Sequence, residues 1–266
     1  MGSTSTATNQ PRRAVALMYH AVSRGAAPPG QDPHYMLDEP AFSEQLGWID
    51  AAGGACSARD WLRDGARRPV LLTFDDGHAS NYEVAFPALR EHGLRADFFV
   101  NPANVGRPGF ATWAQLREMD AAGMSIQSHG YDHVYLTDLD PDTLRERLHA
   151  ARLRIEDGVG AAVTLLAPPG GRMPAGLAAT AGQCGYRHVL SSRPGRIRAA
   201  RHPAVLPRLA VTAPLPGSRL RAWIRGSGAA VLREQLRHGA LSAAKRMLGD
   251  ARYERARLLA LAGRRS

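Results

Sequence analysis

Short apolar segments alternate with longer amphipathic segments along the chain between residues 14 and 211. The short segments have the length and the β-branched and aromatic residues of buried strands, and the segments between them suit helices. This alternation is typical of βα units arranged around a mostly parallel sheet. The predicted strands cover residues 14–19, 70–74, 96–100, 124–127, 163–166, 188–191 and 206–211.

Three of the predicted helices have recognisable starts or apolar faces. The clearest runs from Asp140 to Gly158, with an aspartate as its N-cap and Pro141 at its first helical position. Its apolar stripe consists of Leu144, Leu148, Ala151 and Ile155. Thr112 and Gln115 form a capping box at the start of a second helix. The apolar residues of the third are Phe42, Leu46 and Ile49.

These elements predict an α/β fold, a distorted or incomplete (β/α) barrel of about seven strands, with a C-terminal helical extension. A chain of 266 residues permits one large domain or two modest ones. After Pro216 the composition changes to Arg, Ala and Leu without a β signal. We therefore expect a disordered leader at residues 1–13, the barrel domain at residues 14–216 and a basic helical extension at residues 217–266.

Composition excludes an integral membrane protein. Hydrophobic residues at 44% and charged residues at 22% are ordinary for a globular protein, and no segment reaches the ~18 apolar residues of a membrane-spanning helix. Residues 1–13 contain no apolar segment of a secretory signal, which predicts a cytoplasmic location. Cys56 and Cys184 match no metal or redox spacing, so we expect buried, reduced thiols.

The net charge of +10 is concentrated in the C-terminal segment. From Ser218 to Ser266 there are twelve Lys or Arg residues and three acidic residues, a net charge of +9, so the rest of the chain is close to neutral. A basic segment of this kind can bind nucleic acid, an anionic membrane surface or an anionic polymer, and charge alone does not distinguish these partners.

Polar residues of catalytic types follow four of the predicted strands directly. They are His20, the pair Asp75 and Asp76, His129, and the segment from Pro168 to Gly171. In βα barrels the active site is built at the carboxyl ends of the strands, so these residues are expected to lie together.

The chemistry of these residues suits a divalent metal. Gly77 after the two aspartates lets the chain turn, so both carboxylates can face one cavity. His129 and His133 are four residues apart, a spacing that brings two imidazoles to one side of a compact loop. One carboxylate and two histidines make a three-ligand set with open positions for water, as in catalytic rather than structural metal sites.

With these motifs the chain resembles the polysaccharide deacetylase family, carbohydrate esterases with a NodB-like homology domain. The motifs are Thr73-Phe74-Asp75-Asp76-Gly77, Ser128-His129 through His133, and Leu136-Thr137. The opening segment 17–22 (Leu-Met-Tyr-His-Ala-Val) and the later segment 206–211 (Leu-Pro-Arg-Leu-Ala-Val) are similar to the subgroup of poly-N-acetylglucosamine deacetylases of exopolysaccharide systems. The resemblance covers residues 14–211.

The resemblance implies a division of roles between the two aspartates. Asp76, His129 and His133 would be the metal ligands, and Asp75 the general base for the attacking water. Zinc is the default metal for nitrogen and oxygen ligands, and nickel, cobalt or iron would satisfy the same set.

The family's third motif, which in many members reads Arg-Pro-Pro-Tyr-Gly, aligns with residues 167–171. This alignment makes the backbone N–H of Gly170 the donor to the oxyanion. A register shifted by one residue would put Pro169 there, which has no N–H.

The chain departs from the family at two positions. The motif arginine that would orient the base and lower its pKa is replaced by Ala167, and we predict that Arg208, near another strand end, takes its place beside Asp75. Gly130 stands where a small hydroxyl residue is common.

The leaving amine needs a general acid. The Leu-x-His motif that supplies it in many members has no convincing copy after residue 187. In the subgroup that opens with Met-Tyr-His the N-terminal histidine takes this role, so His20 is the candidate and His202 a weaker rival. His78 and Asp132 could contact substrate or support the ligands, and Trp113 and Tyr131 could stack on a sugar, although each also suits a structural role.

We therefore predict a metal-dependent hydrolase that removes the N-acetyl group from an acetamido sugar of a surface polysaccharide or of its lipid-linked precursor. The basic tail suggests peripheral contact with the inner membrane. Deformylation of a lipid-linked amino sugar and a catalytically silent glycan- or membrane-binding module are the alternatives. Nucleic acid is the least favoured partner, and it would require salt-sensitive binding to arbitrary DNA.

Overall fold

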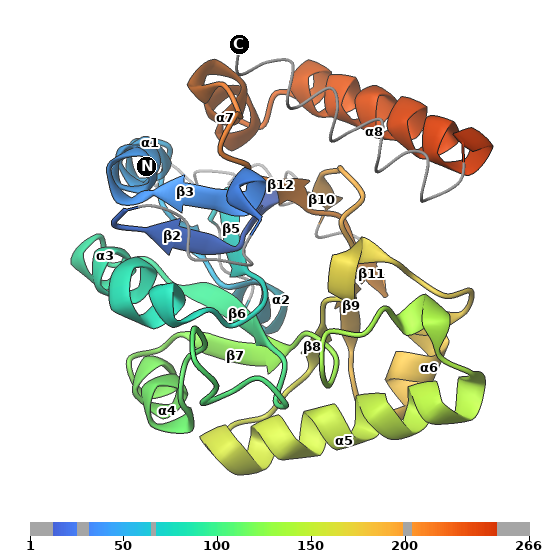
Figure 1. Ribbon diagram of the computed structural model, residues 1–266. Coiled ribbons are helices and arrows are strands. Elements are labelled where there is room, and N and C mark those ends of the chain that lie inside the picture. The colour runs from blue at the N-terminus through green and yellow to red at the C-terminus, as the bar shows by residue number, and fades with distance from the viewer. Residues whose placement is uncertain (1–12, 26–31, 65–67, 199–203, 249–266) are drawn as a thin grey trace, which may run out of the picture.

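The computed structural model describes residues 13–25, 32–64, 68–198 and 204–248 (Figure 1). Six parallel strands form most of a barrel in the order β1-β5-β6-β7-β8-β9. They are β1 (Arg13–Tyr19), β5 (Val70–Phe74), β6 (Ala96–Val100), β7 (Ser125–Ser128), β8 (Leu165–Leu166) and β9 (His188–Leu190). The predicted α/β barrel of about seven strands is confirmed.

Two short strands extend into the gap between β9 and β1, so that the barrel is nearly closed. β11 (Val205–Leu206) pairs with β9, and β12 (Leu209–Ala210) pairs with β1, both in parallel. The prediction of one continuous strand over residues 206–211 is therefore wrong in detail. Pro207 has no N–H for a ladder, and Arg208 donates its backbone N–H to the Arg193 carbonyl at 3.1 Å, so the strand is interrupted at these two residues.

Four further strands were not predicted from the sequence, because each has only two or three residues. β2 (Ala21–Ser23) and β3 (Met36–Asp38) form a separate parallel pair. β4 (Ala55–Cys56) adds to β5, and β10 (Ile197–Arg198) pairs antiparallel with β1.

Helices surround the barrel (Figure 1). They are α1 (Glu39–Ala51), α2 (Ala58–Asp64), α3 (Phe86–Glu91), α4 (Trp113–Ala121), α5 (Pro141–Val159) and α6 (Leu177–Gln183), with shorter turns η1 (Pro33–Tyr35), η2 (Asn81–Ala85), η3 (Leu136–Asp138) and η4 (Pro169–Gly171). The predicted caps are confirmed: Asp140 accepts from the N–H groups of Asp142 and Thr143, and Thr112 and Gln115 form the capping box of α4.

Alternate residues of each strand face two different cores. Val15, Leu17 and Tyr19 of β1 pack outward under the helices, whereas Ala14 and Ala16 face the barrel interior. The interior core also contains Cys56, Trp61, Leu71, Phe99, Leu165, Ala167, Leu190 and Leu206. Both cysteines are buried free thiols, as predicted.

The predicted domain boundary after residue 216 stays a prediction, and the first helix after it packs against the barrel domain. α7 (Gly217–Ile224) buries Leu220, Trp223 and Ile224 in the outer core, and α8 (Gly228–Leu248) follows it. Among the described residues, no helix is long and apolar enough to cross a membrane. The predicted leader lies outside the described residues except for Arg13, which is the first residue of β1.

A buried carboxylate ties α2 to the barrel. Asp97 of β6 is fully buried and accepts hydrogen bonds from the N–H groups of Ala58 and Arg59, the first residues of α2, at 2.5 and 3.3 Å. We expect Asp97→Ala to lower the free energy of unfolding by about 2 kcal/mol, because two buried N–H groups lose their acceptor. Urea denaturation at pH 7 measures this.

Asp120→Ala is the control. Asp120 is partly exposed and pairs with Arg59 at 3.7 Å, so its loss should cost less than about 1 kcal/mol, and equal losses would contradict the capping role.

Candidate metal centre

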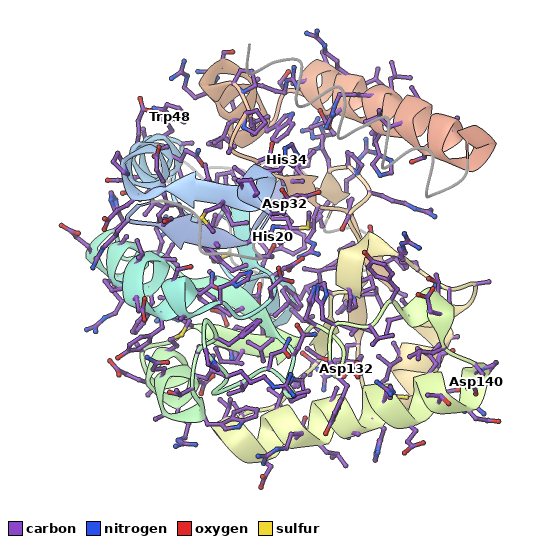
Figure 2. The ribbon with its side chains drawn as sticks, in the orientation of Figure 1. His20, Asp32, His34, Trp48, Asp132 and Asp140 are labelled. Atoms are coloured by element: carbon purple, nitrogen blue, oxygen red, sulfur yellow. The ribbon has the colours of Figure 1, made fainter. Side chains whose placement is uncertain are left out.

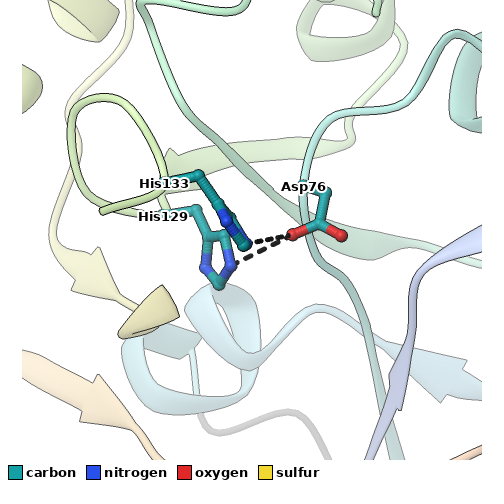
Figure 3. A group of neighbouring side chains, drawn as sticks. All are labelled: Asp76, His129 and His133. Carbon is teal, nitrogen blue, oxygen red and sulfur yellow. Dashed lines mark ion pairs between the residues drawn. The ribbon is translucent and has the colours of Figure 1, made fainter. Parts of the chain in front are cut away.

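Asp76, His129 and His133 come together at the carboxyl ends of β5 and β7 (Figure 3). Oδ1 of Asp76 lies 3.2 Å from Nε2 of His129 and 3.2 Å from Nε2 of His133. The three candidate ligand atoms all lie within 4.8 Å of one another. The structure thus brings together the three residues that the sequence motifs single out as metal ligands.

The donor set fits a divalent metal. Oδ1 of Asp76 is buried and has no hydrogen-bond partner within the described part of the chain, although two imidazole nitrogens lie near it. Three convergent nitrogen and oxygen atoms that do not satisfy one another by hydrogen bonding suit a shared cation.

Two of these ligands have an unusual backbone. Asp76 and His133 have φ of 75° and 66°, and they are the two non-glycine residues with positive φ in the described part of the chain. A left-handed conformation of such residues is uncommon and concentrates at functional sites. Gly77 follows with φ of 72°, and a Cβ there would lie 3.0 Å from Cγ1 of Val100, so the turn after β5 requires glycine.

Asp75 forms a buried, bidentate ion pair with Arg208. The guanidinium Nη1 and Nη2 donate to Oδ1 and Oδ2 of Asp75 at 2.6 and 2.8 Å, and Arg208 is 0% exposed. Arg208 also donates to Thr73 Oγ1 and to the Ser191 carbonyl, both at 3.3 Å. Arg208 thus lies beside the Asp75 carboxylate, in the role that the sequence analysis predicted for it because Ala167 replaces the motif arginine.

Charge controls ionisation at this site. Burial by itself would raise the pKa of Asp75, but the Arg208 guanidinium outweighs it and holds this pKa below its ordinary value. Burial likewise opposes ionisation of Asp76, yet the imidazoles of His129, His133 and His78 hold its pKa well below the ordinary value. The nearby Asp76 carboxylate raises the pKa of His133. Both aspartates are therefore carboxylates at neutral pH.

His20 follows β1 and packs against Tyr35, with ring centroids 4.5 Å apart. Its Nδ1 is buried without a hydrogen-bond partner among the described residues. Burial lowers the pKa of His20, while the charges of Asp76 and Asp75 oppose this change. Figure 2 places His20 near the segment that carries Asp32 and His34. His202, the weaker candidate for the acid, lies outside the described residues.

Gly170 lies in η4 with φ of 59°. Its N–H donates no hydrogen bond within the described part of the chain, whereas the next N–H, of Gly171, donates to Pro168. The backbone of this loop is anchored to β7, because Ala167 N–H donates to the Ser128 carbonyl at 2.9 Å. The N–H of Gly170 is thus available to a ligand.

Two further side chains support the metal ligands: His78, which the sequence offered only as one of several candidates, and Asn101, which it did not predict. His78 Nε2 lies 3.3 Å from Oδ2 of Asp76, the oxygen that does not face the other two histidines. Asn101 donates its side-chain amide to the His129 carbonyl. Asn101 directly follows β6, so the strand-end rule that selected the other residues also applies to it.

The remaining candidates have structural contacts. Asp132 pairs with Arg147 of α5, beside which Figure 2 places it. Trp113 packs against Gly158, where a Cβ would lie 2.3 Å from its ring, so it belongs to the interface of α4 and α5. Tyr131 is partly exposed in the loop between the two histidine ligands.

Sequence comparison identifies related proteins. Residues 63–189 match the sequence model of the family described as polysaccharide deacetylase. YxkH of Bacillus subtilis strain 168, whose name assigns it to the same family, is 26% identical over 82% of this chain and 78% of its own. The poly-β-1,6-N-acetyl-D-glucosamine N-deacetylase of Escherichia coli K12 is 30% identical over 46% of this chain, which is 21% of its own length. A chitin deacetylase of Pestalotiopsis sp. is 31% identical over 46% of this chain and 40% of its own.

Solved structures share the fold. The Streptococcus pyogenes deacetylase PplD superposes with a TM-score of 0.69 at 24% identity, over 77% of this chain and 95% of its own. IcaB from Ammonifex degensii superposes with a TM-score of 0.68 at 24% identity, over 81% of this chain and 98% of its own.

Proposed function

Because the chain carries a polysaccharide deacetylase domain, we propose that it removes N-acetyl groups from a polymer of N-acetylglucosamine in a metal-dependent reaction. The observation that carries this proposal is the Asp75–Arg208 ion pair next to the three candidate ligands Asp76, His129 and His133. The names of the Escherichia coli and Pestalotiopsis relatives support N-acetylglucosamine polymers as the substrate class.

A divalent metal held by Asp76, His129 and His133 would supply a Lewis acid that polarises the amide carbonyl and lowers the pKa of water to about 7. Zinc is the metal that we propose for this ligand set. Asp75, kept ionised by Arg208, accepts the proton of the attacking water, whose oxygen bonds to the acetamide carbon. Its carboxylate is fixed in orientation by the two guanidinium bonds.

Two further groups complete the reaction. The Gly170 N–H donates to the oxygen of the acetamide as negative charge develops on it. His20 donates a proton to the nitrogen as the C–N bond breaks, so that acetate and a free amine result. Burial lowers the pKa of His20, and the charges of Asp76 and Asp75 act against burial by favouring the protonated imidazole that this step requires.

The alternatives predict different outcomes. A silent binding module has no use for a general base beside the ligands, so the buried ion pair of Asp75 favours catalysis. Deformylation would use the same residues and release formate instead of acetate.

The direct test is acetate release from N-acetylglucosamine oligomers by the purified protein. We expect acetate that requires metal: dialysis against a chelator abolishes the release and added zinc restores it. Formate from a formylated amino sugar, without acetate from any oligomer, would support the deformylase. Release of neither product by the zinc-loaded protein would contradict the proposed reaction.

The metal centre itself is tested by His133→Ala. Removal of one of three ligands is expected to lower zinc affinity by at least about 100-fold, measured by competition with a chromogenic chelator. His149→Ala, an exposed histidine on α5, is the matched control and should bind zinc as the wild type does. Equal affinity of both variants would show that zinc binds elsewhere.

Peripheral membrane contact and a cytoplasmic location stay predictions. The feature that motivates the membrane prediction is the pair of exposed leucines Leu232 and Leu236 on the basic helix α8.

A further inference from the structure

Three exposed apolar side chains gather in one loop beside the metal centre. Tyr131, Val134 and Tyr135 are 36%, 40% and 37% exposed, and the candidate ligand His133 belongs to the same segment. They are three of the seven large apolar side chains that are exposed in the described part of the chain. Single exposed apolar residues are common, whereas a cluster at a reaction centre indicates contact with a ligand.

The backbone of this loop is fixed. The Tyr131 carbonyl accepts a hydrogen bond from Ala103 N–H at 3.0 Å. Asp132 pairs with Arg147 of α5 and accepts the Val134 N–H at 3.4 Å. The loop that carries Tyr131 and Tyr135 is therefore anchored to the rest of the domain.

Tyr135 connects this loop to the segment that carries Gly170. The guanidinium carbon of Arg172 lies 4.2 Å from the Tyr135 ring centroid. A Cβ at position 170 would lie 2.5 Å from Cε1 of Tyr135, so the edge of the ring touches the Gly170 backbone. The ring of Tyr135 thus contacts the loop of the proposed oxyanion donor, two residues along the chain from the metal ligand His133.

This combination of groups suits a neutral sugar. A tyrosine ring offers an apolar face together with a hydroxyl group, and a guanidinium group offers several donors in one plane. The carbon-bound hydrogens of a pyranose pack on an aromatic face, and its hydroxyl and amide oxygens accept hydrogen bonds from donors at the edge.

We infer that Tyr131, Tyr135 and Arg172 form a subsite for a sugar unit next to the one that is deacetylated. The inference rests on the proposed function and names the residues that would bind a second unit of its polymer substrate. Only a chain of sugars occupies the metal centre and the subsite at once, so the subsite selects an oligomer or polymer over a single sugar on a lipid carrier.

The test compares free N-acetylglucosamine with its five-unit oligomer. Tyr131→Ala and Tyr135→Ala are each expected to raise the KM for the oligomer about tenfold relative to the KM for the single sugar. Tyr135→Phe keeps the ring and should behave as the wild type. Leu153→Ala removes an exposed leucine of α5 and should change no constant. An equal loss of kcat on both substrates would mean that the rings only hold the Gly170 loop in place, and the subsite would be wrong.

Calorimetric binding of the five-unit oligomer separates this inference from the proposed function. Binding to the wild type about tenfold tighter than to Tyr135→Ala, without acetate release, would keep the subsite and reject the deacetylase. Equal binding to both proteins, with acetate released, would reject the subsite and keep the deacetylase.

Discussion

Replacement of Asp75 by asparagine is expected to lower kcat for acetate release by about 1000-fold. Asparagine has nearly the shape of aspartate but cannot take a proton from water at neutral pH. The three candidate ligands are untouched, since Asp75 bonds to Arg208 and is not one of them. Steady-state acetate release from the five-unit oligomer measures the effect.

The Asp75→Asn result needs two accompanying measurements. Bound zinc per chain should stay equal to the wild type, because the loss is in proton transfer and not in metal binding. The thermal midpoint is measured on the same samples, since the variant leaves the buried Arg208 charge without its partner. Asp120→Asn makes the same chemical change at a partly exposed position of α4 and should keep full activity. Retention of more than about a tenth of wild-type kcat by Asp75→Asn would exclude Asp75 as the base.

The strand pattern predicted most of the barrel because burial determines it. Segments 70–74 and 96–100 are apolar except for the buried Thr73 and Asp97, and both faces of these strands are covered, one by helices and one by the barrel interior. Helix α5 was equally clear, since the Asp140 cap and its apolar stripe are local features of the sequence. The resemblance to polysaccharide deacetylases was also visible in the sequence, because its motifs are short and local, and residues 63–189 match the model of that family.

Long-range features of the site were harder to predict. Arg208 was predicted to lie near a strand end and to pair with Asp75. Its two hydrogen bonds to Asp75 come from a break in the strand at Pro207, which the hydrophobic pattern does not show. The positive φ of Asp76 and His133 has only a weak signal in side-chain type, because aspartate and histidine adopt it more often than most residues but still rarely. The contact of Tyr135 with Gly170 joins segments 35 residues apart and follows from the packing of two loops, so no local spacing encodes it.

Arg208→Met is expected to move the acid limb of the pH profile of kcat/KM upward by about 1 to 3 pH units. Asp75 accepts a proton only while it is ionised, so activity falls as the pH drops through its pKa. Burial raises this pKa and Arg208 lowers it, with a net pKa below the ordinary value. Without the guanidinium the effect of burial remains, so a higher pH is needed to ionise the carboxyl. Acetate release measured from pH 4 to pH 9 gives the profile.

The matched control is Arg152→Met, which removes an arginine that pairs with Glu156 of α5 away from the metal centre. It should leave the profile unchanged. An Arg208→Met variant with lower activity but the same acid limb would show that Arg208 only holds the loop between β11 and β12.

Stability offers an independent test of the same ion pair. Arg208→Met alone is expected to lower the free energy of unfolding by about 3 kcal/mol at pH 7, because it leaves a buried carboxylate without its counter-charge. The double variant Arg208→Met with Asp75→Asn removes both charges and should regain part of this loss, while its activity stays as low as that of Asp75→Asn. If the loss of stability came only from the missing arginine side chain, removing the Asp75 charge as well would not restore any of it. Recovery in the double variant would therefore show that the loss comes from the unpaired carboxylate of Asp75.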